Sequence, residues 1–223
     1  MILCIGNVVS PALLERIQQI VPNERFADGV ETAGWHAKLV KANRQITRYS
    51  AEAEKARVEI ADALKSNDVF RSAVLPKAFR PLLFSRYDAG MSYGSHVDDA
   101  IMGGDQPVRS DVSFTVFLTP PEGYDGGQLV IESAGGEQAY KLEAGHVVVY
   151  PSTTLHRVEP VAKGVRYVAV GWVQSLVRDP ARREILFDLD TTRRSLFQQH
   201  GKTREFDHLA KTYANLLRMW AEV

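Results

Sequence analysis

The stretch "YGSHVDDA", residues 93–100, places one histidine and two aspartates within four positions. On an extended chain successive side chains point to opposite faces, so His96 and Asp98 share a face and Asp99 points away. A histidine and a carboxylate two residues apart can occupy two adjacent positions around a metal ion. The triplet alone is a weak signal, because His-x-Asp also arises by chance. A metal site therefore needs a third ligand from another part of the chain.

Two later histidines, His146 and His156, are candidates for that ligand. His146 opens "GHVVVYP" directly after a glycine and is most simply a residue at a strand start. His156 opens a strand in "PSTTLHRVEP", and Arg166 follows in "GVRYVAVGWVQ". The connection "EPVAKG" between them is short, which predicts that the two strands are antiparallel neighbours. We therefore expect His156 to be the third ligand.

Arg166 lies on an apolar strand and shares one face with Val168, Val170 and Trp172. An unpaired buried charge is costly, and a guanidinium fork suits a carboxylate held by two hydrogen bonds. Two histidines and one carboxylate form the facial triad of non-haem Fe(II) oxygenases. Such a triad leaves three positions on an octahedral iron. A 2-oxo acid fills two of them, oxygen takes the last, and Arg166 would hold the distal carboxylate of 2-oxoglutarate.

These residues must be positioned by a β-rich segment with helices on either side. Residues 1–77 are mostly helical, with "SPALLERIQQIV" beginning at an N-cap Ser10 and Pro11, and further helices over "AEAEKARVEIADALKSN" and residues 69–73. Residues 78–177 contain short β-rich runs between Gly, Pro and Asp turns, which predicts an antiparallel jelly roll. Residues 178–223 return to helix, and "EFDHLAKTYANLLRMWAEV" carries an apolar stripe.

We therefore expect an α+β fold with a mainly β core. Residues 1–177 form one domain, with supporting helices over 1–77 and the jelly-roll core over 78–177, and residues 178–223 form a C-terminal helical extension. The C-terminal stripe fits two arrangements equally well, a homodimer through these helices or docking on the same chain.

The composition excludes several classes of partner. The chain has 27 basic and 27 acidic residues and no net charge, so it lacks the electrostatic footprint of a protein that binds nucleic acid or anionic membranes. No apolar run approaches the length of a transmembrane helix. The start, "MILCIGNVV", lacks a basic region and a cleavage site and is expected to form a first strand. A single cysteine, Cys4, excludes a disulfide framework and fits the cytoplasm.

Three stretches carry a family resemblance: "RYDAGMSYGSHVDD", "RSDVSFTVFLTPPEGYDGGQLVI" and "PSTTLHRVEPVAKGVRYVAVGW". Together they resemble the Fe(II)/2-oxoglutarate dioxygenase domain of the prolyl-hydroxylase type, and more narrowly the bacterial PKHD-type hydroxylases of the PiuC group. The resemblance covers about residues 78–175. It implies a double-stranded β-helix that hydroxylates an unactivated C–H bond with molecular oxygen. Iron would lie on His96, Asp98 and His156 and 2-oxoglutarate on Arg166, with ascorbate as an auxiliary cofactor.

The same resemblance assigns further residues to the pocket. Tyr87 and Tyr93 are expected to reach the co-substrate or the pocket, and Trp172 is expected to line the site beyond the arginine. The run "FTVFLT" departs from the prolyl-hydroxylase pattern, because it has no tyrosine where some relatives place one beside the arginine. Thr115 or Ser113 would substitute for that tyrosine.

Other functions remain open at the level of sequence. A nucleic-acid demethylase of the AlkB type carries a second arginine six residues after the first, where this chain has Trp172. A non-catalytic jelly-roll module that binds a metal or small molecule would not need Arg166 as a clamp. A cupin-type metalloenzyme usually draws more histidines from its first motif. The substrate, a small molecule or a peptide, is not specified, although the PiuC group suggests a link to bacterial iron uptake.

Overall fold

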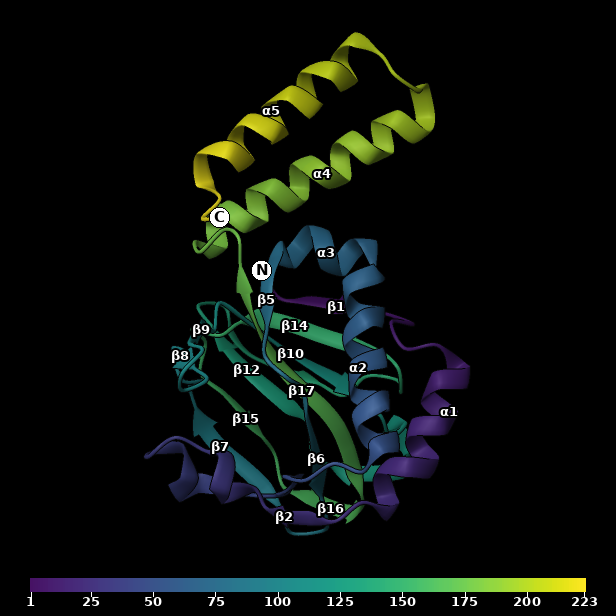
Figure 1. Cartoon of the computed structure of the whole chain (residues 1–223), viewed down its shortest axis with the longest axis vertical. Helices are drawn as coiled ribbons and strands as arrows, with labels where there is room; N and C mark the ends of the chain where they lie inside the picture. The colour runs from purple at the N-terminus through teal and green to yellow at the C-terminus, as the bar shows by residue number, and fades with distance from the viewer.

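The computed structural model describes residues 1–223 and shows two antiparallel β-sheets packed face to face (Figure 1). The larger sheet has the order β1 (Leu3–Ile5), β14 (Val147–Pro151), β10 (Val112–Phe117), β17 (Arg166–Ser175), β6 (Leu83–Tyr87), β4 (Arg44–Ile46) and β2 (Phe26–Asp28), with β5 (Pro76–Phe79) also on β17. The smaller sheet has the order β13 (Gly136–Tyr140), β12 (Leu129–Ser133), β15 (His156–Val158), β7 (Ser92–His96) and β3 (Lys41–Ala42). Two short ribbons pair β8 (Ile101–Met102) with β9 (Val108–Arg109) and β11 (Tyr124–Gly126) with β16 (Val161–Gly164). The predicted double-stranded β-helix is confirmed.

Helices lie on both sides of this core in the sequence, as predicted, but the N-terminal segment also contributes β1, β2, β3 and β4 to the two sheets. The helices are α1 (Pro11–Ile20), α2 (Ala51–Ser66), α3 (Asp68–Val74), α4 (Pro180–His200) and α5 (Arg204–Trp220). Short 3-10 turns cover η1 (Val21–Asn23), η2 (Gly29–Thr32), η3 (Ala37–Val40) and η4 (Pro121–Gly123). Helix α1 begins as its sequence predicts, because the Ser10 side chain accepts a hydrogen bond from the Leu13 N–H and Pro11 takes the first helical position.

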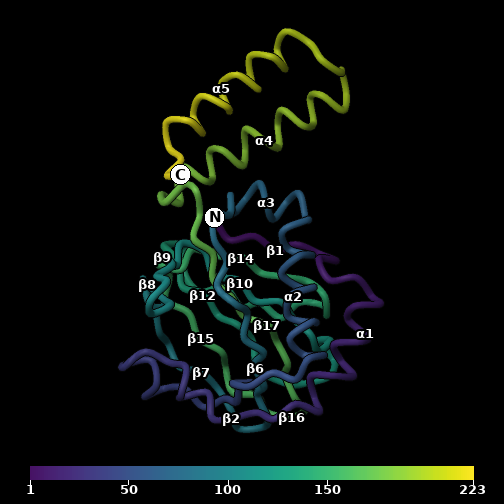
Figure 2. Tube along the Cα trace, viewed as in Figure 1, coloured from purple at the N-terminus to yellow at the C-terminus, as the bar shows by residue number.

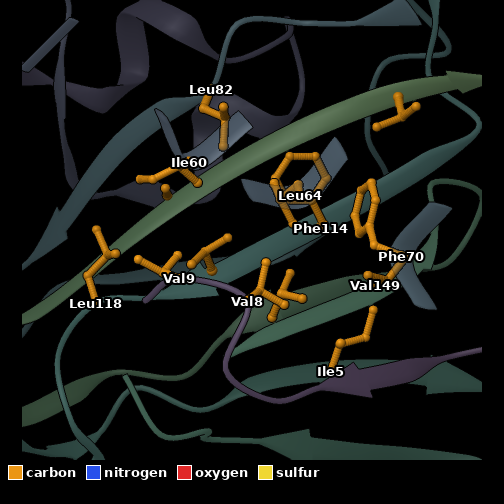
Figure 3. Close-up of a cluster of buried hydrophobic side chains, with 14 of the residues drawn as sticks. Ile5, Val8, Val9, Ile60, Leu64, Phe70, Leu82, Phe114, Leu118 and Val149 are labelled. Atoms are coloured by element: carbon orange, nitrogen blue, oxygen red, sulfur yellow. The ribbon is translucent and has the colours of Figure 1, made fainter. Parts of the chain in front are cut away.

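Helices α1, α2 and α3 cover the outer face of the larger sheet (Figure 1). Side chains from these helices and from alternate positions of β10 and β17 form the main core, where the rings of Phe70 and Phe114 meet edge to face at 5.7 Å (Figure 3). The intervening residues, including Thr115 on β10 and Arg166 on β17, face the space between the sheets. The alternation along each strand thus separates an apolar outer core from an interior that holds both a second apolar cluster and the polar site residues.

The expected pairing between the strands of His156 and Arg166 is wrong. Strand β15 pairs with β12 and β7 in the smaller sheet, whereas β17 pairs with β10 and β6 in the larger one. The connecting residues form β16, which pairs with β11 and carries the chain from one sheet to the other. A short connection fits a hairpin and a crossing between packed sheets equally well, so its length could not distinguish them. The two side chains therefore reach the interior from opposite sheets.

Helices α4 and α5 form a hairpin that projects away from the sheets (Figure 1). Its base packs on the core through Leu75, Val177 and Leu186, with Leu216, Leu217 and Trp220 against them. The Glu222 N–H donates to the Leu176 carbonyl oxygen at 2.7 Å, so the C-terminus returns to the point where the hairpin leaves the core (Figure 2). The apolar stripe of α5 therefore docks within its own chain. None of the helices combines the length and apolar character needed to cross a membrane.

A buried carboxylate ties α4 to α3. Asp190 accepts hydrogen bonds from Ser72 Oγ, Arg193 Nε and Arg194 Nε, each at 2.7 Å. Burial opposes ionisation of this group, but the hydrogen bonds from Ser72, Arg194 and Arg193 outweigh it and lower the pKa of Asp190 below its ordinary value of 3.8. The side chain is therefore an ionised anchor between the hairpin and the core at neutral pH.

Candidate active site

The predicted metal ligands converge between the two sheets. His96 ends β7, His156 begins β15, and the two residues are register partners across the antiparallel pair. Directly opposite residues of such a pair project to the same face, which brings both imidazoles into the interior. Asp98 follows β7 by two residues, and one ligand atom from each of the three side chains lies within 4.8 Å of the others. Asp99 lies outside this cluster, as the alternation predicts.

Main-chain carbonyls orient both imidazoles. His96 Nδ1 lies 2.9 Å from the Gly94 oxygen, and His156 Nδ1 lies 3.1 Å from the Thr154 oxygen. A carbonyl oxygen only accepts, so each Nδ1 carries the proton and each Nε2 offers a lone pair to a metal. Burial, and then the neighbouring His156, lowers the pKa of His96 to about 4, so this ring is neutral at pH 7.

The Asp98 carboxylate is fixed by a short chain of hydroxyls. Ser113 Oγ donates to Asp98 Oδ2 at 2.6 Å and lies 2.7 Å from Ser152 Oγ. Because the Ser113 proton is used on the carboxylate, Ser152 is the donor in the second bond. The structure thus places Ser113 behind a metal ligand, so the alternative expectation that it stands beside the arginine is wrong. A fixed carboxylate and two imidazoles suit a divalent first-row metal such as Fe(II).

Arg166 is almost completely buried, with 1% of its surface exposed, and lies opposite Tyr87 in the strand register. Its guanidinium carbon lies 5.0 Å from the centre of the Tyr87 ring and 5.5 Å from that of Phe117. The Nε and Nη1 atoms are buried and have no hydrogen-bond partner. Gly127 has a φ of +64°, and a Cβ there would lie 3.2 Å from Arg166 Cδ and closer still to Val161. The guanidinium is therefore packed between aromatic rings, and two of its donors are free to bind an anion.

A single cavity of about 470 Å³ connects the triad to Arg166. This volume lies in the range of small-molecule sites. Tyr87, Tyr93, Thr115 and Trp172 all line the cavity. The ring of Tyr93 stacks on His96, with centroids 3.6 Å apart and planes at 16°, so it packs directly on a proposed metal ligand.

Three residues near the site were not predicted from the sequence. The Tyr150 ring lies 5.1 Å from that of His156, and burial raises the pKa of its hydroxyl. Tyr150 ends an unbroken apolar run in which no alternation marks the inward face. Tyr124 is buried and its hydroxyl has no hydrogen-bond partner. Lys41 also lines the cavity, although its surroundings in sequence resemble an ordinary basic segment.

Comparison with known proteins agrees with this geometry. The pattern of the 2OG-Fe(II) oxygenase superfamily matches residues 82–174, and that of the PKHD-type hydroxylase C-terminal domain matches residues 180–222. A PKHD-type hydroxylase of a Synechococcus strain is 56% identical over 224 residues, and one from Rippkaea orientalis is 57% identical over 222 residues. Both alignments cover 100% of each chain. The chain belongs to the PKHD-type hydroxylases. It is an Fe(II)- and 2-oxoglutarate-dependent hydroxylase. The alternative function of a non-catalytic jelly-roll module is therefore wrong.

Solved structures confirm the fold of this PKHD-type hydroxylase. A Pseudomonas putida prolyl-4-hydroxylase is 19% identical with a TM-score of 0.54, covering 78% of this chain and 92% of that one. A Trichoplax adhaerens prolyl hydroxylase, solved with a hypoxia inducible factor peptide, is 17% identical with a TM-score of 0.59, covering 78% and 83%. At these identities the likeness concerns the architecture and does not extend to the substrate.

Proposed function

We propose that this hydroxylase holds Fe(II) through Nε2 of His96, Nε2 of His156 and a carboxylate oxygen of Asp98. The observation that carries the proposal is the convergence of these three groups in the cavity whose lining also contains the unpaired guanidinium of Arg166. Arg166 then holds the distal carboxylate of 2-oxoglutarate through its two free donors. When bound, Fe(II) and 2-oxoglutarate together supply the oxidising power that transfers one oxygen atom of O2 to a C–H bond.

The surrounding residues bind, orient and exclude water. Tyr87 supports the guanidinium and, with Tyr93 and Thr115, forms the wall against which 2-oxoglutarate lies. Trp172 lies opposite Ser113 in the strand register and lines the side of the cavity where the substrate would approach. The main-chain carbonyls at the two imidazoles and the hydroxyl at Asp98 hold the ligand atoms in place before the metal arrives, which limits reorganisation on binding.

Several finer assignments rest on the resemblance to the PiuC group. We propose ascorbate as the auxiliary reductant that keeps the iron ferrous. We also propose a role in bacterial iron uptake, with a siderophore-like molecule or an uptake-associated protein as substrate. A cytoplasmic location is supported by the single cysteine, Cys4. The division into a dioxygenase domain over 1–177 and an extension over 178–223 is supported by the two family patterns, which end at 174 and begin at 180.

The test is succinate formation from 2-oxoglutarate in air with Fe(II) and ascorbate. We expect turnover by the wild type and by Asp105→Ala, and none by Asp98→Ala, because only the second change removes a ligand. Asp105 is exposed and does not line the cavity, so the pair controls for the loss of one negative charge. Full activity in Asp98→Ala would show that the ligand assignment is wrong. Absence of succinate from the wild type, together with no 2-oxoglutarate binding to metal-loaded protein by calorimetry, would contradict the proposed function.

A further inference from the structure

A second buried cation lines the active-site cavity. Lys41 is 8% exposed, and its Nζ donates to Thr32 Oγ1 at 3.0 Å and to Gln45 Oε1 at 3.3 Å. Both acceptors are neutral, and no carboxylate oxygen lies within 4 Å of the ammonium. The Nζ atom also lies 5.1 Å from the centre of the Tyr93 ring, which in turn stacks on His96. The charge therefore lies close to the proposed iron ligands with no carboxylate in contact, and only Asp98 and Asp28 act on it from a longer distance.

The other buried cations are each accounted for. Arg183 donates to the main-chain oxygens of Val177, Arg178 and Asp111. Arg166 is the proposed clamp for 2-oxoglutarate. Lys41 has acceptors for only two of its three N–H donors. Its burial lowers the pKa of the ammonium to about 8, which reflects the cost of a buried charge that an arriving anion would offset.

The cavity lining has a surplus of positive charge. It contains the cations Lys41, Arg80 and Arg166 and the anions Asp98 and Asp99. The two positive charges of Fe(II) and the two negative charges of 2-oxoglutarate cancel, so the loaded site keeps one unbalanced positive charge. A cavity with this balance attracts a singly charged anion.

The lining of the same cavity also contains apolar side chains. Trp172 from β17 and Ile101 and Met102 from β8 line the cavity, and Ile101 is 59% exposed. Arg80 is held next to Trp172, because its main-chain N–H donates to the Trp172 carbonyl oxygen at 2.9 Å. Its guanidinium forms no ion pair with another residue. A ligand with an apolar body and one negative charge would match both the apolar side chains and the surplus positive charge of the cavity lining.

We propose that the molecule to be hydroxylated carries a carboxylate and that Lys41 binds this carboxylate. An ammonium group has three N–H donors, and Lys41 uses two of them on Thr32 and Gln45, so one donor is left for the substrate. Arg80 contributes to the potential that attracts the anion, and the apolar wall holds the rest of the molecule. This inference rests on the proposed function, because it takes the iron and 2-oxoglutarate to occupy the positions assigned above.

The test uses the protein loaded with Fe(II) and 2-oxoglutarate in the absence of oxygen. Chelation gives a metal-to-ligand charge-transfer band, and its formation tests the proposed function alone. The inference is tested next, by the perturbation of that band by two matched probes, N-acetyl-leucine and N-acetyl-leucinamide. These differ only in the charged group. We expect the acid to perturb the band at a concentration about tenfold or more below that of the amide, because a charge-assisted hydrogen bond is stronger than a neutral one.

Variants assign the preference to one residue. Lys41→Met keeps the length of the side chain and its packing on Tyr93, and we expect it to respond equally to both probes. Lys38→Met removes an exposed lysine from the same segment and should keep the wild-type preference. If Lys41→Met does not form the band, Lys41→Gln replaces it.

Three outcomes would overturn the inference. The wild type could respond equally to both probes, or to neither. The Lys41 variant could keep the preference for the acid. Lys41→Met could also need more 2-oxoglutarate than the wild type to form the band and still prefer the acid probe over the amide. That result would show that Lys41 binds the co-substrate. A wild type that forms no band at all would instead count against the proposed function.

Discussion

Replacing Arg166 with methionine should separate ligand binding from stability. In the wild type two buried donors, Nε and Nη1, lack partners within the protein and are the proposed contacts of 2-oxoglutarate. A hydrogen bond to a charged group contributes about 1.5–3 kcal/mol, so losing two weakens binding by about 3 kcal/mol or more. Since each 1.4 kcal/mol is tenfold in affinity, we expect Arg166→Met to bind 2-oxoglutarate about 100-fold more weakly.

The ligand-free protein should respond in the opposite direction. A buried cation without a counterion is unfavourable, and methionine can still pack between Tyr87 and Phe117. We therefore expect the free energy of unfolding of ligand-free Arg166→Met to equal or exceed that of the wild type. Calorimetry of 2-oxoglutarate binding to Mn(II)-loaded protein and chemical denaturation of the ligand-free protein measure the two effects. An affinity within threefold of the wild type, or a ligand-free protein destabilised by about 2 kcal/mol, would refute the reasoning.

Three other predictions follow from contacts around and beyond the site. Ser113→Ala should weaken Fe(II) binding about 10- to 100-fold in a chelator competition, because Asp98 loses its supporting donor, whereas the exposed Ser133→Ala should not. Asp190→Asn should lower the free energy of unfolding by about 2 kcal/mol at pH 7. Because the pKa of Asp190 is lower in the folded protein, its contribution to the free energy of unfolding is complete above pH 3.8 and is lost as the pH falls through the folded-state pKa. Denaturation at pH 3 should therefore show a smaller difference in stability between the wild type and Asp190→Asn than at pH 7. The exposed Asp188→Asn should have the stability of the wild type at both pH values. The stripe of α5 packs on its own chain, so the homodimer that stays a prediction would have to use the outer surface of these helices, where Met219 is 73% exposed. Sedimentation should then give twice the 24.9 kDa chain mass for the wild type and the mass of one chain for Met219→Lys, and a monomeric wild type would contradict the prediction.

The sequence predicted the site better than its connections. His96, Asp98 and Arg166 could be placed because strand alternation is local, and a two-residue spacing fixes which side chains share a face. The route from His156 to Arg166 was wrong, since it depends on which sheet accepts each strand. Lys41 was missed for a related reason. Its strand has two residues and is held by pairing with β7, a contact between distant segments that leaves no local pattern.

The register between β7 and β15 has a consequence for how the enzyme matures. His96 and His156 are opposite each other in strands that are 60 residues apart in the chain. A slip of one residue in this pairing would turn one imidazole to the outer face of the sheet. Only the native register of β7 and β15 therefore presents both imidazoles to the metal. Metal binding stabilises this register relative to the shifted registers, because the metal binds them more weakly. Iron supply during synthesis would then influence the yield of correctly aligned protein as well as its activity.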